Sequence, residues 1–579
     1  MDDPENGAKT GGKPGGQKGL SMERRMLLAF LLMGLVLMLT PYFYRSSPPS
    51  SKAPVKPAAS EDSPAKPSAK PPVEQAATAP EAPLPAVPAG QVGAEKEETY
   101  IVETDLARVV FSNKGAVVRS WILKKYKDGA GKPLDLVHAA GAARAGYPFS
   151  LVFKGKAAAD LKQVLYAAKP VSDGLGVDFE FSNGRVWSRK SFRFRKDSYL
   201  ADVSSEVTQD GKSLPHYIAW RGGFGDGTVP NHPATEHTLH FDVTANKLIV
   251  KEAKAASDGP LSAIGTFSFA GIEDQYFAAV FLPASGVSTE VFTYQDHVAG
   301  EQKDKEVPHI GMSVGGSGAN RMPIFVGPKD IDILRKVNPK LEQVVDFGWF
   351  SFLAKPLFLA VNWVNDRWVQ NYGWSIVVVT IIINFMLLPL KFTSLKSMKK
   401  MQMLQPQIAA INEKYKGIGI RDPRKADQNQ EVMELYKKHG VNPMGGCVPM
   451  LLQIPFFIAF YKVLTVAIEM RGASWLWVSD LSQPETLPIR ILPIAMIVSQ
   501  FIMQKMTPST TADPSQQRIM LMMPLILGFM FYGVSSGLVL YWLTGNVVGI
   551  AQQWFFNKTS VAPVPPPPPV KQVKKGAKK

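Results

Sequence analysis

The sequence predicts a polytopic α-helical membrane protein with six transmembrane helices, which carries an all-β sandwich domain outside the membrane. Four apolar stretches lie between Tyr372 and Asn557, and a fifth, Met26–Tyr44, lies near the N-terminus. Apolar runs of about 17–25 residues are long enough to cross a bilayer as helices. The polar region between these stretches shows the period-two alternation of β-strands. The formal net charge of +16 over 579 residues is concentrated beside the apolar stretches, which is typical of cytoplasmic loops.

The N-terminal region is predicted to anchor the chain in the membrane. Residues 1–25 are rich in Gly and Lys, and Arg24 and Arg25 precede the apolar run 26–44. A cleaved signal peptide has a similar run, but a small-residue cleavage site should follow it, and none does. We therefore expect a cytoplasmic N-terminus and an uncleaved transmembrane signal anchor. Residues 45–98 are rich in Pro and Ala, so we expect an extended linker that cannot bury a core.

Residues 99–326 are predicted to form a periplasmic β-sandwich domain. Short alternating runs recur between Gly, Asn and Asp turns, and Asn183-Gly184 separates two of them, which favours a hairpin. The single cysteine, Cys447, excludes an intrachain disulfide. Three histidines are close in this region, but their spacing matches no standard metal site, so we expect no metal ion and no other cofactor. They are His232, His237 and His240.

Residues 327–371 are predicted to contain amphipathic helices at the outer membrane surface. The stretch is apolar but interrupted by Lys355, Pro356 and two charged residues, and it contains several tryptophans. Tryptophan prefers the headgroup level of a bilayer. The alternative, a further deep span, is disfavoured by the charges. The tryptophans are Trp349, Trp363 and Trp368.

The charge distribution predicts the topology of the membrane half. Residues 391–442 hold eleven Lys and Arg and show helical periodicity, so we expect a cytoplasmic helical hairpin. The loop 469–486 holds only Arg471 and is expected in the periplasm. The loop 505–518 and the basic tail 558–579 return to the cytoplasm. The five later transmembrane helices are predicted at 372–390, 443–468, 487–504, 519–535 and 537–557.

Enzymatic function is not predicted. Gly311–Gly315 and Gly533–Gly537 match the G-x-S-x-G pattern of hydrolases, but neither lies between a strand and a helix of such a fold. The sequence has no Walker A motif, which disfavours nucleotide hydrolysis by this chain.

Polar side chains within the predicted spans are the strongest candidates for function, because they are costly in lipid and tend to face a watery interior. Hydrogen bonding between helices is the alternative for each of them. Lys391 follows Asn384 by seven residues, which puts it on a similar face nearer the cytoplasm, although it could equally be a simple interface anchor. The candidates within the spans are Thr380, Asn384, Gln453, Gln500, Tyr541, Trp542 and Thr544.

Two further groups of side chains are candidates for contacts at the cytoplasmic side. Met398, Met401 and Met403 begin the hairpin, and flexible thioethers suit surfaces that accept varied apolar partners. They could also be ordinary apolar filler. The lysines of the tail could bind ribosomal RNA or anionic lipid, or could be simply solvated. These are Lys571, Lys574, Lys575, Lys578 and Lys579.

Several motifs in one order resemble the YidC/Oxa/Alb family of membrane protein insertases, in the Gram-negative form with a large periplasmic domain. The similarity is strong over about Phe325–Asn557 and weaker over the outer domain. The motifs are Met401–Pro406, Val441–Pro449, Gln453–Pro455, Gln504–Pro508 with Asp513–Gln517, and Ser536–Trp542.

The resemblance implies a five-helix core in the bacterial inner membrane with a hydrophilic groove, open to cytoplasm and lipid but closed outward. It implies that the chain inserts nascent inner-membrane proteins and helps them fold, alone or with the Sec translocon, with the ribosome and membrane lipids as further partners and no DNA. The polar flank of a client would enter the groove while its apolar segment slides into lipid, and apolar transfer would supply the free energy.

The sequence departs from the family at one position. The family usually has an arginine four residues after the threonine that matches Thr380, and this chain has Asn384. We hypothesise that Lys391 partly substitutes for the missing charge.

Two other functions stay open from the sequence alone. A secondary transporter or channel would use the same intramembrane polar residues, but the spans contain no buried Asp or Glu and no inverted repeat. A periplasmic binding module merely anchored by the spans is the second alternative.

Overall fold

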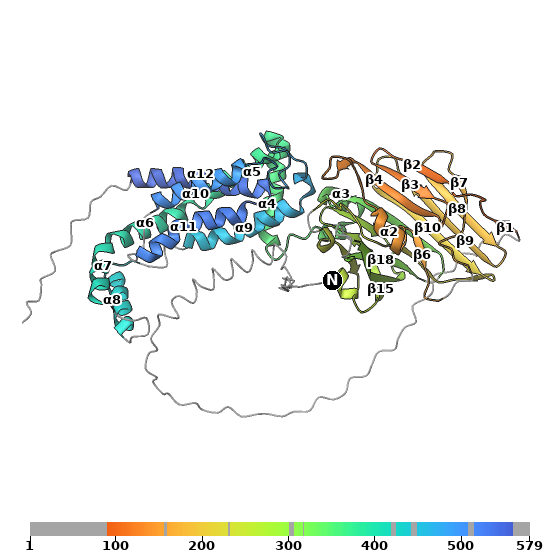
Figure 1. Cartoon of the computed structure of the whole chain (residues 1–579), viewed down its shortest axis with the longest axis horizontal. Helices are drawn as coiled ribbons and strands as arrows, with labels where there is room; N and C mark the ends of the chain where they lie inside the picture. Colours follow the sequence, from red (N-terminus) through yellow and green to blue (C-terminus); the bar gives the residue numbers. More distant parts are fainter. Residues whose placement is uncertain are drawn as a thin grey trace, which may run out of the picture.

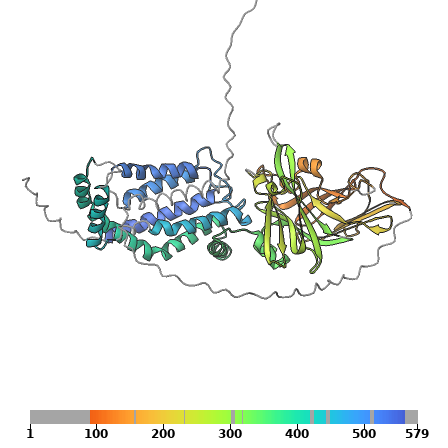
Figure 2. The same ribbon diagram turned by 90° about the horizontal axis from the view of Figure 1, so that it is seen from below.

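The computed structural model describes residues 90–559, except 156–158, 230–231, 300–305, 317, 418–423, 442–447 and 508–513. The predicted cytoplasmic N-terminus, the signal anchor, most of the linker and the five tail lysines lie outside the described residues. The described chain has two parts, a β-rich part at the right of Figure 1 and a helical part at the left, and Figure 2 shows the same division from below.

The β-rich part contains a 15-stranded sheet and a four-stranded sheet of order β2-β3-β4-β5. The main path of the large sheet is β1-β8-β9-β10-β19-β16-β15-β17-β18-β12-β6. The strands are β1 Gln91–Val92, β2 Thr99–Glu103, β3 Ala107–Ser112, β4 Val117–Lys127, β5 Pro133–Asp135, β6 Ser150–Val152, β7 Ala167–Pro170, β8 Gly176–Asn183, β9 Val186–Phe194, β10 Leu200–Gln209, β11 Lys212–Ser213, β12 His216–Trp220, β13 His237–Asp242, β14 Lys247–Glu252, β15 Leu261–Glu273, β16 Phe277–Phe281, β17 Ser288–Ala299, β18 Glu306–Gly316 and β19 Asn320–Pro328. Short helices connect them: α2 Ala139–Ala145, η1 His232–Ala234 and η2 Ala253–Ala256.

The long strand β15 links the two halves of the 15-stranded sheet, β1 to β16 on one side and β17 to β6 on the other. Residues 261–266 pair with β17, whereas residues 270–273 pair with β16 and the second half also pairs with β13. A strand that changes sheets in this way makes a corner and lets both inner faces share one core. Aromatic rings fill that core, including Phe111, Phe149 and Trp220.

The hairpin predicted at Asn183-Gly184 is confirmed. Strands β8 and β9 pair antiparallel, with Ser182 opposite Trp187. Gly184 has φ of +86°, which glycine adopts without steric cost. The predicted linker, however, is too long at its C-terminal end, because the backbone of Gln91 and Val92 pairs with Ser182 and Asn183 at the end of β8 and so forms β1.

The segment between the two parts contains α3 Ile331–Val337, η3 Pro339–Val344 and α4 Ser351–Val364, followed by a π-helical turn η4 at Asn365–Val369. Glu342 of η3 holds this segment together, since its carboxylate accepts from Arg335 Nε at 2.7 Å and pairs with Lys355 of α4. The Arg335 hydrogen bond, with the Lys355 contact, lowers the pKa of Glu342 to about 2.

Replacing Glu342 by glutamine is expected to lower the free energy of unfolding by about 1–2 kcal/mol near neutral pH. The native pKa lies below the ordinary value of 4.5, so the carboxylate stabilises the fold above that pH. The stabilisation is lost as the pH falls toward about 2, and the variant should then match the parent. Thermal unfolding in detergent at several pH values measures the difference. Glu252→Gln, at an exposed position of β14, is the control and should change nothing.

The helical part is built from long helices that lie side by side (Figure 1). Its helices are α5 Tyr372–Met386, α6 Leu388–Met403, α7 Gln405–Lys414, α8 Arg424–Lys438, α9 Val448–Val466, α10 Ile491–Met506, α11 Pro514–Phe531 and α12 Ser536–Thr559, with η6 Ile468–Met470 after α9. Within the described residues, no single helix has both the length and the apolar composition of a membrane span. Among the residues that the structure describes, Ser351–Val369 together with Tyr372–Met386 meets both criteria as a pair, and these two segments are bent by 115°. The number of transmembrane helices therefore stays a prediction.

Helix boundaries differ from the predicted ones where prolines occur. The helix predicted at 372–390 ends at Met386, because Pro389 stands in the first turn of the next helix, α6. The first arm of the predicted hairpin is likewise divided, because Pro406 stands in the first turn of α7. Helices α7 and α8 pack through a small apolar cluster and project from the end of the helical part far from the β sandwich (Figure 1). The cluster is Met401, Leu404, Ile408, Tyr436 and Val441.

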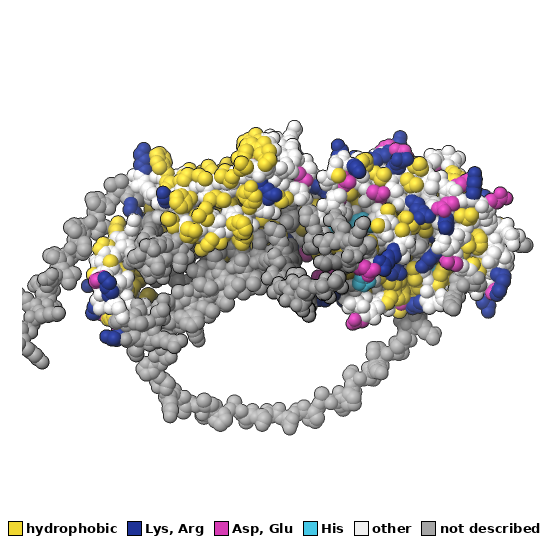
Figure 3. Space-filling view, in the orientation of Figure 1, with side chains coloured by type: hydrophobic (Ala, Val, Ile, Leu, Met, Phe, Trp, Pro, Cys, Tyr) yellow, Lys and Arg dark blue, Asp and Glu magenta, His cyan; other side chains and the backbone are white. Residues whose placement is uncertain are grey.

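On the face that Figure 3 shows, the coloured surface of the helical part is mostly apolar, whereas charged side chains are scattered over the β sandwich. Phe529 is 88% exposed, and Ile382, Phe385 and Val498 are also exposed. Trp349, Trp363 and Trp368 are exposed too. Exposed apolar patches of this kind mark surfaces that contact lipid or other proteins.

Candidate functional site

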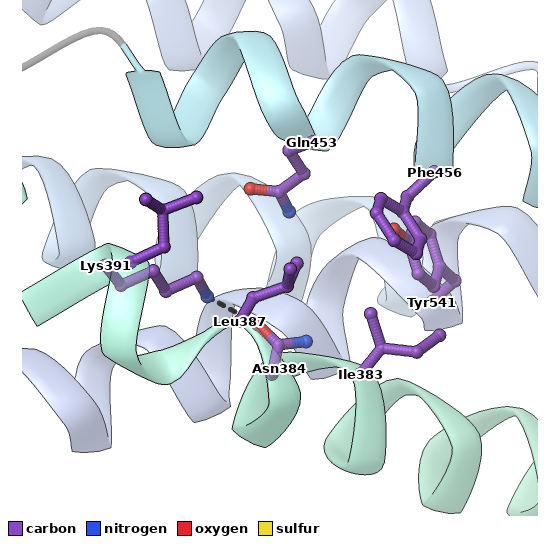
Figure 4. Close-up of a pocket in the computed structure, with 8 residues that line it drawn as sticks. Ile383, Asn384, Leu387, Lys391, Gln453, Phe456 and Tyr541 are labelled. Carbon is purple, nitrogen blue, oxygen red and sulfur yellow. Dashed lines mark hydrogen bonds between the residues drawn. The ribbon is translucent and has the colours of Figure 1, made fainter.

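A polar network lies where α5 ends and α6 begins. The helix axis breaks at Leu387, and Lys391 on the first turns of α6 points back toward α5 (Figure 4). Its Nζ donates to Asn384 Oδ1 at 2.6 Å and to Gln552 Oε1 of α12 at 3.4 Å. Gln552 Nε2 in turn donates to the backbone oxygen of Asn384 at 3.2 Å. One lysine and two amides therefore tie α5, α6 and α12 together.

The charge of Lys391 has no acidic partner. Within the part of the chain that the structure describes, no Asp or Glu carboxylate lies within ion-pair distance of its Nζ. Amide oxygens hold the ammonium group by their dipoles alone, so its positive charge is left uncompensated. An uncompensated cation among apolar helices attracts anionic groups strongly, because the surrounding dielectric is low.

A cavity opens beside this network (Figure 4). Its polar lining comes from four helices, with Asn384 of α5 and Lys391 of α6 at one side, the exposed Gln453 of α9 opposite, and Tyr541 of α12. The Tyr541 ring stacks on Phe460 with ring centres 4.3 Å apart, which fixes its position. The remaining lining is apolar, from Ile383, Leu387, Leu390 and Phe456. The cavity thus offers polar and apolar groups to one occupant.

The other four residues predicted within the spans are not among the residues that line this cavity. Thr380 and Thr544 donate to backbone oxygens one turn back in their own helices, at 2.6 and 2.8 Å. Gln500 accepts from Trp542 Nε1 at 3.3 Å, and Trp542 packs against Phe457 and Phe531. The threonine bonds stay within one helix, whereas the Trp542 contacts join α12 to α9, α10 and α11, which is the interhelical role given above as the alternative for such residues.

The sequence interpretation missed Gln552. This residue lies at the end of the last apolar stretch, where a glutamine resembles an ordinary polar flank. Gln552 lies 161 residues from Lys391 in the sequence, and only the folded structure shows that the two side chains are in contact. Among the predicted methionines, Met398 and Met401 are buried and Met403 is exposed, so only Met403 is available to a partner in this arrangement.

The end of the helical part that faces the β sandwich is tightly packed. The first backbone N–H groups of α12 donate to the loop after α9, from Ser536 to Gln483 O at 2.8 Å and from Gly537 to Leu481 O at 2.9 Å. A side-chain carbon at Gly373 would lie 2.2 Å from the Trp475 ring, so glycine alone allows α5 to approach this loop. The loop after α9 therefore closes this end of the helical part, and the cavity beside Lys391 lies away from it.

Two family models match the chain. Residues 99–360 match the model described as the YidC periplasmic domain, and residues 363–562 match the model described as 60Kd inner membrane protein. The membrane protein insertase YidC of Geotalea uraniireducens (strain Rf4) is 35% identical over 561 residues, which covers 93% of this chain and 99% of that protein.

The chain belongs to the YidC family of membrane protein insertases.

Other YidC proteins and solved structures are also similar. The membrane protein insertase YidC of Syntrophus aciditrophicus (strain SB) is 34% identical and covers 93% of this chain and 100% of that protein. A crystal structure of an active YidC insertase with its first transmembrane domain resolved matches with 20% identity and a TM-score of 0.34, over 80% of this chain and 93% of that one. A galactose mutarotase-like protein from Lactobacillus casei matches with 10% identity and a TM-score of 0.27, over 40% of this chain and 100% of that one.

Membership of the YidC family confirms the sequence-based prediction of function. The family is one of bacterial inner-membrane insertases with a periplasmic domain, and it is not a family of enzymes. The β sandwich, which is the YidC periplasmic domain, and the helical part with its cavity thus belong to one insertase chain.

Proposed function

We propose that this YidC protein inserts nascent membrane proteins by receiving their polar flanks in the cavity beside Lys391. The observation that carries the proposal is the uncompensated ammonium group of Lys391, held by Asn384 and Gln552 within an apolar set of helices. An acidic or polar client flank gains hydrogen bonds and charge pairing there, instead of crossing hydrocarbon unassisted. The adjacent apolar segment of the client then enters lipid along the exposed apolar surface of the helices.

The proposed topology gives this path a direction. Six transmembrane helices, with both chain ends and the α7–α8 hairpin in the cytoplasm, would open the cavity to the cytoplasmic side. The packed loop at Leu481 and Gln483 closes the opposite, periplasmic end and supports this direction. Helix α4, with its exposed Trp349 and Trp363, would lie at the outer membrane surface.

Three partners follow from the proposed role. Nascent membrane proteins are the clients, and the Sec translocon would deliver some of them. The ribosome or anionic lipid would contact the hairpin, whose exposed lysines, such as Lys437 and Lys438 of α8, supply positive charge. The basic tail would add to that contact.

Reconstitution tests the proposal against the alternatives of transport and of an anchored binding module. In proteoliposomes, the purified protein is expected to insert a small single-span client without nucleotide, and to give no flux of ions or small solutes above that of empty liposomes. Solute flux without insertion would contradict the proposal and favour a transporter.

Deletion of Tyr100–Gly315 is expected to leave most of the insertion activity, because the cavity is built entirely from α5, α6, α9 and α12. The same proteoliposome assay measures this, with the full chain as the reference. Complete loss of insertion by a deletion protein that still reaches the membrane and keeps its helical circular dichroism would favour the anchored binding module instead.

A further inference from the structure

Three histidines and one glutamate from separate segments of the β sandwich converge on one point. His138 directly precedes α2, His232 lies in η1, Glu236 directly precedes β13, and His309 lies on β18. One ligand atom from each lies within 4.8 Å of all the others. This grouping differs from the predicted proximity of His232, His237 and His240, because His237 lies near Glu273 and His240 packs on Phe267.

The distances suit a four-coordinate metal ion. The Nδ1 atoms of His309, His232 and His138 lie 2.9, 3.4 and 3.9 Å from Glu236 Oε1. Tetrahedral Zn²⁺ with bonds of 2.0–2.2 Å sets its ligand atoms about 3.4 Å apart. The four atoms therefore need to move by only a few tenths of an ångström up to about one ångström to close on one ion.

Gly223 leaves open the space that the ion would need. A side-chain carbon at this position would lie 2.6 Å from His138 Nδ1, 2.7 Å from His309 Nδ1 and 3.0 Å from Glu236 Oε1. The backbone there has φ of +99°, which favours glycine. Any other residue would fill the point on which the ligand atoms converge.

The surroundings orient the rings as an outer shell of a metal site does. His138 Nε2 contacts Gly225 O at 3.1 Å, so the lone pair of Nδ1 is left to bind a metal ion. His232 Nε2 faces Asp274 Oδ2 at 3.5 Å, and Asp274 is itself fixed by backbone N–H groups, including that of Phe277 at 2.6 Å. Metal-binding histidines usually donate their second ring nitrogen to a carbonyl or carboxylate. His138 has such a contact, whereas His232 Nε2 lies within ion-pair distance of Asp274 without a hydrogen bond.

His232 is buried without a hydrogen bond to either ring nitrogen. Its side chain is 3% exposed. Burial of an unbonded polar group is costly, so such a group commonly marks a missing ligand. In the described chain, moreover, no Lys or Arg pairs with the buried carboxylates of Glu236 and Asp274.

We infer that His138, His232, Glu236 and His309 form a closed structural site for a divalent transition-metal ion of the Zn²⁺ class. Four protein ligands leave no open position for a substrate, so the ion would stabilise the β sandwich rather than perform chemistry. It would also fix the end nearest the helical part, because Asp274 Oδ2 accepts from Asp226 N at 2.9 Å and Asp226 pairs with Arg471 of the loop after α9.

The test uses the full chain in detergent, purified without a polyhistidine tag and stripped of metal by a chelator that is then removed. Elemental analysis after equilibration with Zn²⁺ is expected to give one ion per chain. Co²⁺ in place of Zn²⁺ should give the visible absorption of a four-coordinate ion. Zn²⁺ should raise the unfolding temperature of the β sandwich by about 5 °C or more.

His309→Ala and Glu236→Gln should each weaken Zn²⁺ binding at least tenfold, whereas His297→Ala, an exposed histidine on β17, should bind as the parent does. Because buried substitutions can unfold the domain, binding is compared only for variants whose near-ultraviolet circular dichroism matches that of the parent. Gly223→Ala, which keeps all four ligands but places a methyl group at a backbone with φ of +99°, should also lose the ion. Failure of the parent chain to retain stoichiometric Zn²⁺, or retention of it by folded His309→Ala and Glu236→Gln chains, would overturn the inference. This test is independent of insertion activity.

Discussion

Replacing Arg471 by alanine is expected to release the β sandwich from the helical part. The partly buried Arg471 side chain pairs with the buried Asp226 and donates to the backbone oxygen of Lys127 at 2.8 Å. Its guanidinium group also lies 5.2 Å from the ring centre of Tyr276. Removing one partner of a buried ion pair costs about 3–5 kcal/mol, because the other charge is left unpaired. A cost of that size shifts the equilibrium between docked and undocked domains by at least about a hundredfold.

Distances between spin labels, one on the β sandwich and one on α10, measure this effect by pulsed electron resonance. The parent should give one narrow distribution and Arg471→Ala a broad one. Arg471→Lys should restore little, since the shorter lysine side chain brings its ammonium group less close to the two oxygens that Arg471 Nη2 contacts. Arg490→Ala is the matched control, because Arg490 contacts Tyr532 within the helical part. An unchanged narrow distribution for Arg471→Ala would show that other contacts, such as Gln275 Nε2 to Thr465 O at 2.7 Å, suffice for docking.

Replacing Lys391 by methionine is expected to reduce insertion of clients with acidic flanks by about tenfold, which corresponds to about 1.4 kcal/mol. Methionine keeps the length of the side chain but removes the charge that Asn384 and Gln552 hold. Clients with neutral flanks should be affected much less, because they lose hydrogen bonding but no charge pairing. Insertion into proteoliposomes of a paired set of clients, identical except for the acidic flank, measures the ratio.

Lys396→Met, at an exposed position of the same helix, is the matched control and should insert both clients as the parent does. Asn384→Ala should have an intermediate effect, since Lys391 would keep its charge but lose its hydrogen bond of 2.6 Å. Equal insertion of acidic and neutral clients by Lys391→Met and the parent would refute the hypothesis that Lys391 replaces the arginine usual in the family.

The elements of this fold could largely be predicted because their signals are local. The β8–β9 hairpin follows from Asn183-Gly184 and the alternation around it, and the helical segments follow from apolar length and prolines. The predicted approach of Lys391 to Asn384 also rests on spacing along the chain, and the hydrogen bond between them agrees with it. By contrast, the Thr380 and Thr544 hydroxyls satisfy themselves within their own helices, which composition cannot distinguish from a side chain that faces a cavity.

By itself, the sequence determined that this chain has a polar β-rich half and an apolar helical half, and its motifs indicated the insertase family. The division into two halves and the family motifs both depend on residues close together in the chain, whose periodicity, turn residues and charge can be read without knowing the fold. Only the tertiary structure decided which distant side chains meet: Gln552 with Lys391, Arg471 with Asp226, and His138 with His232 and His309. Such contacts depend on how sheets and helices pack across 70 to more than 200 residues, and no local pattern in the sequence specifies that packing.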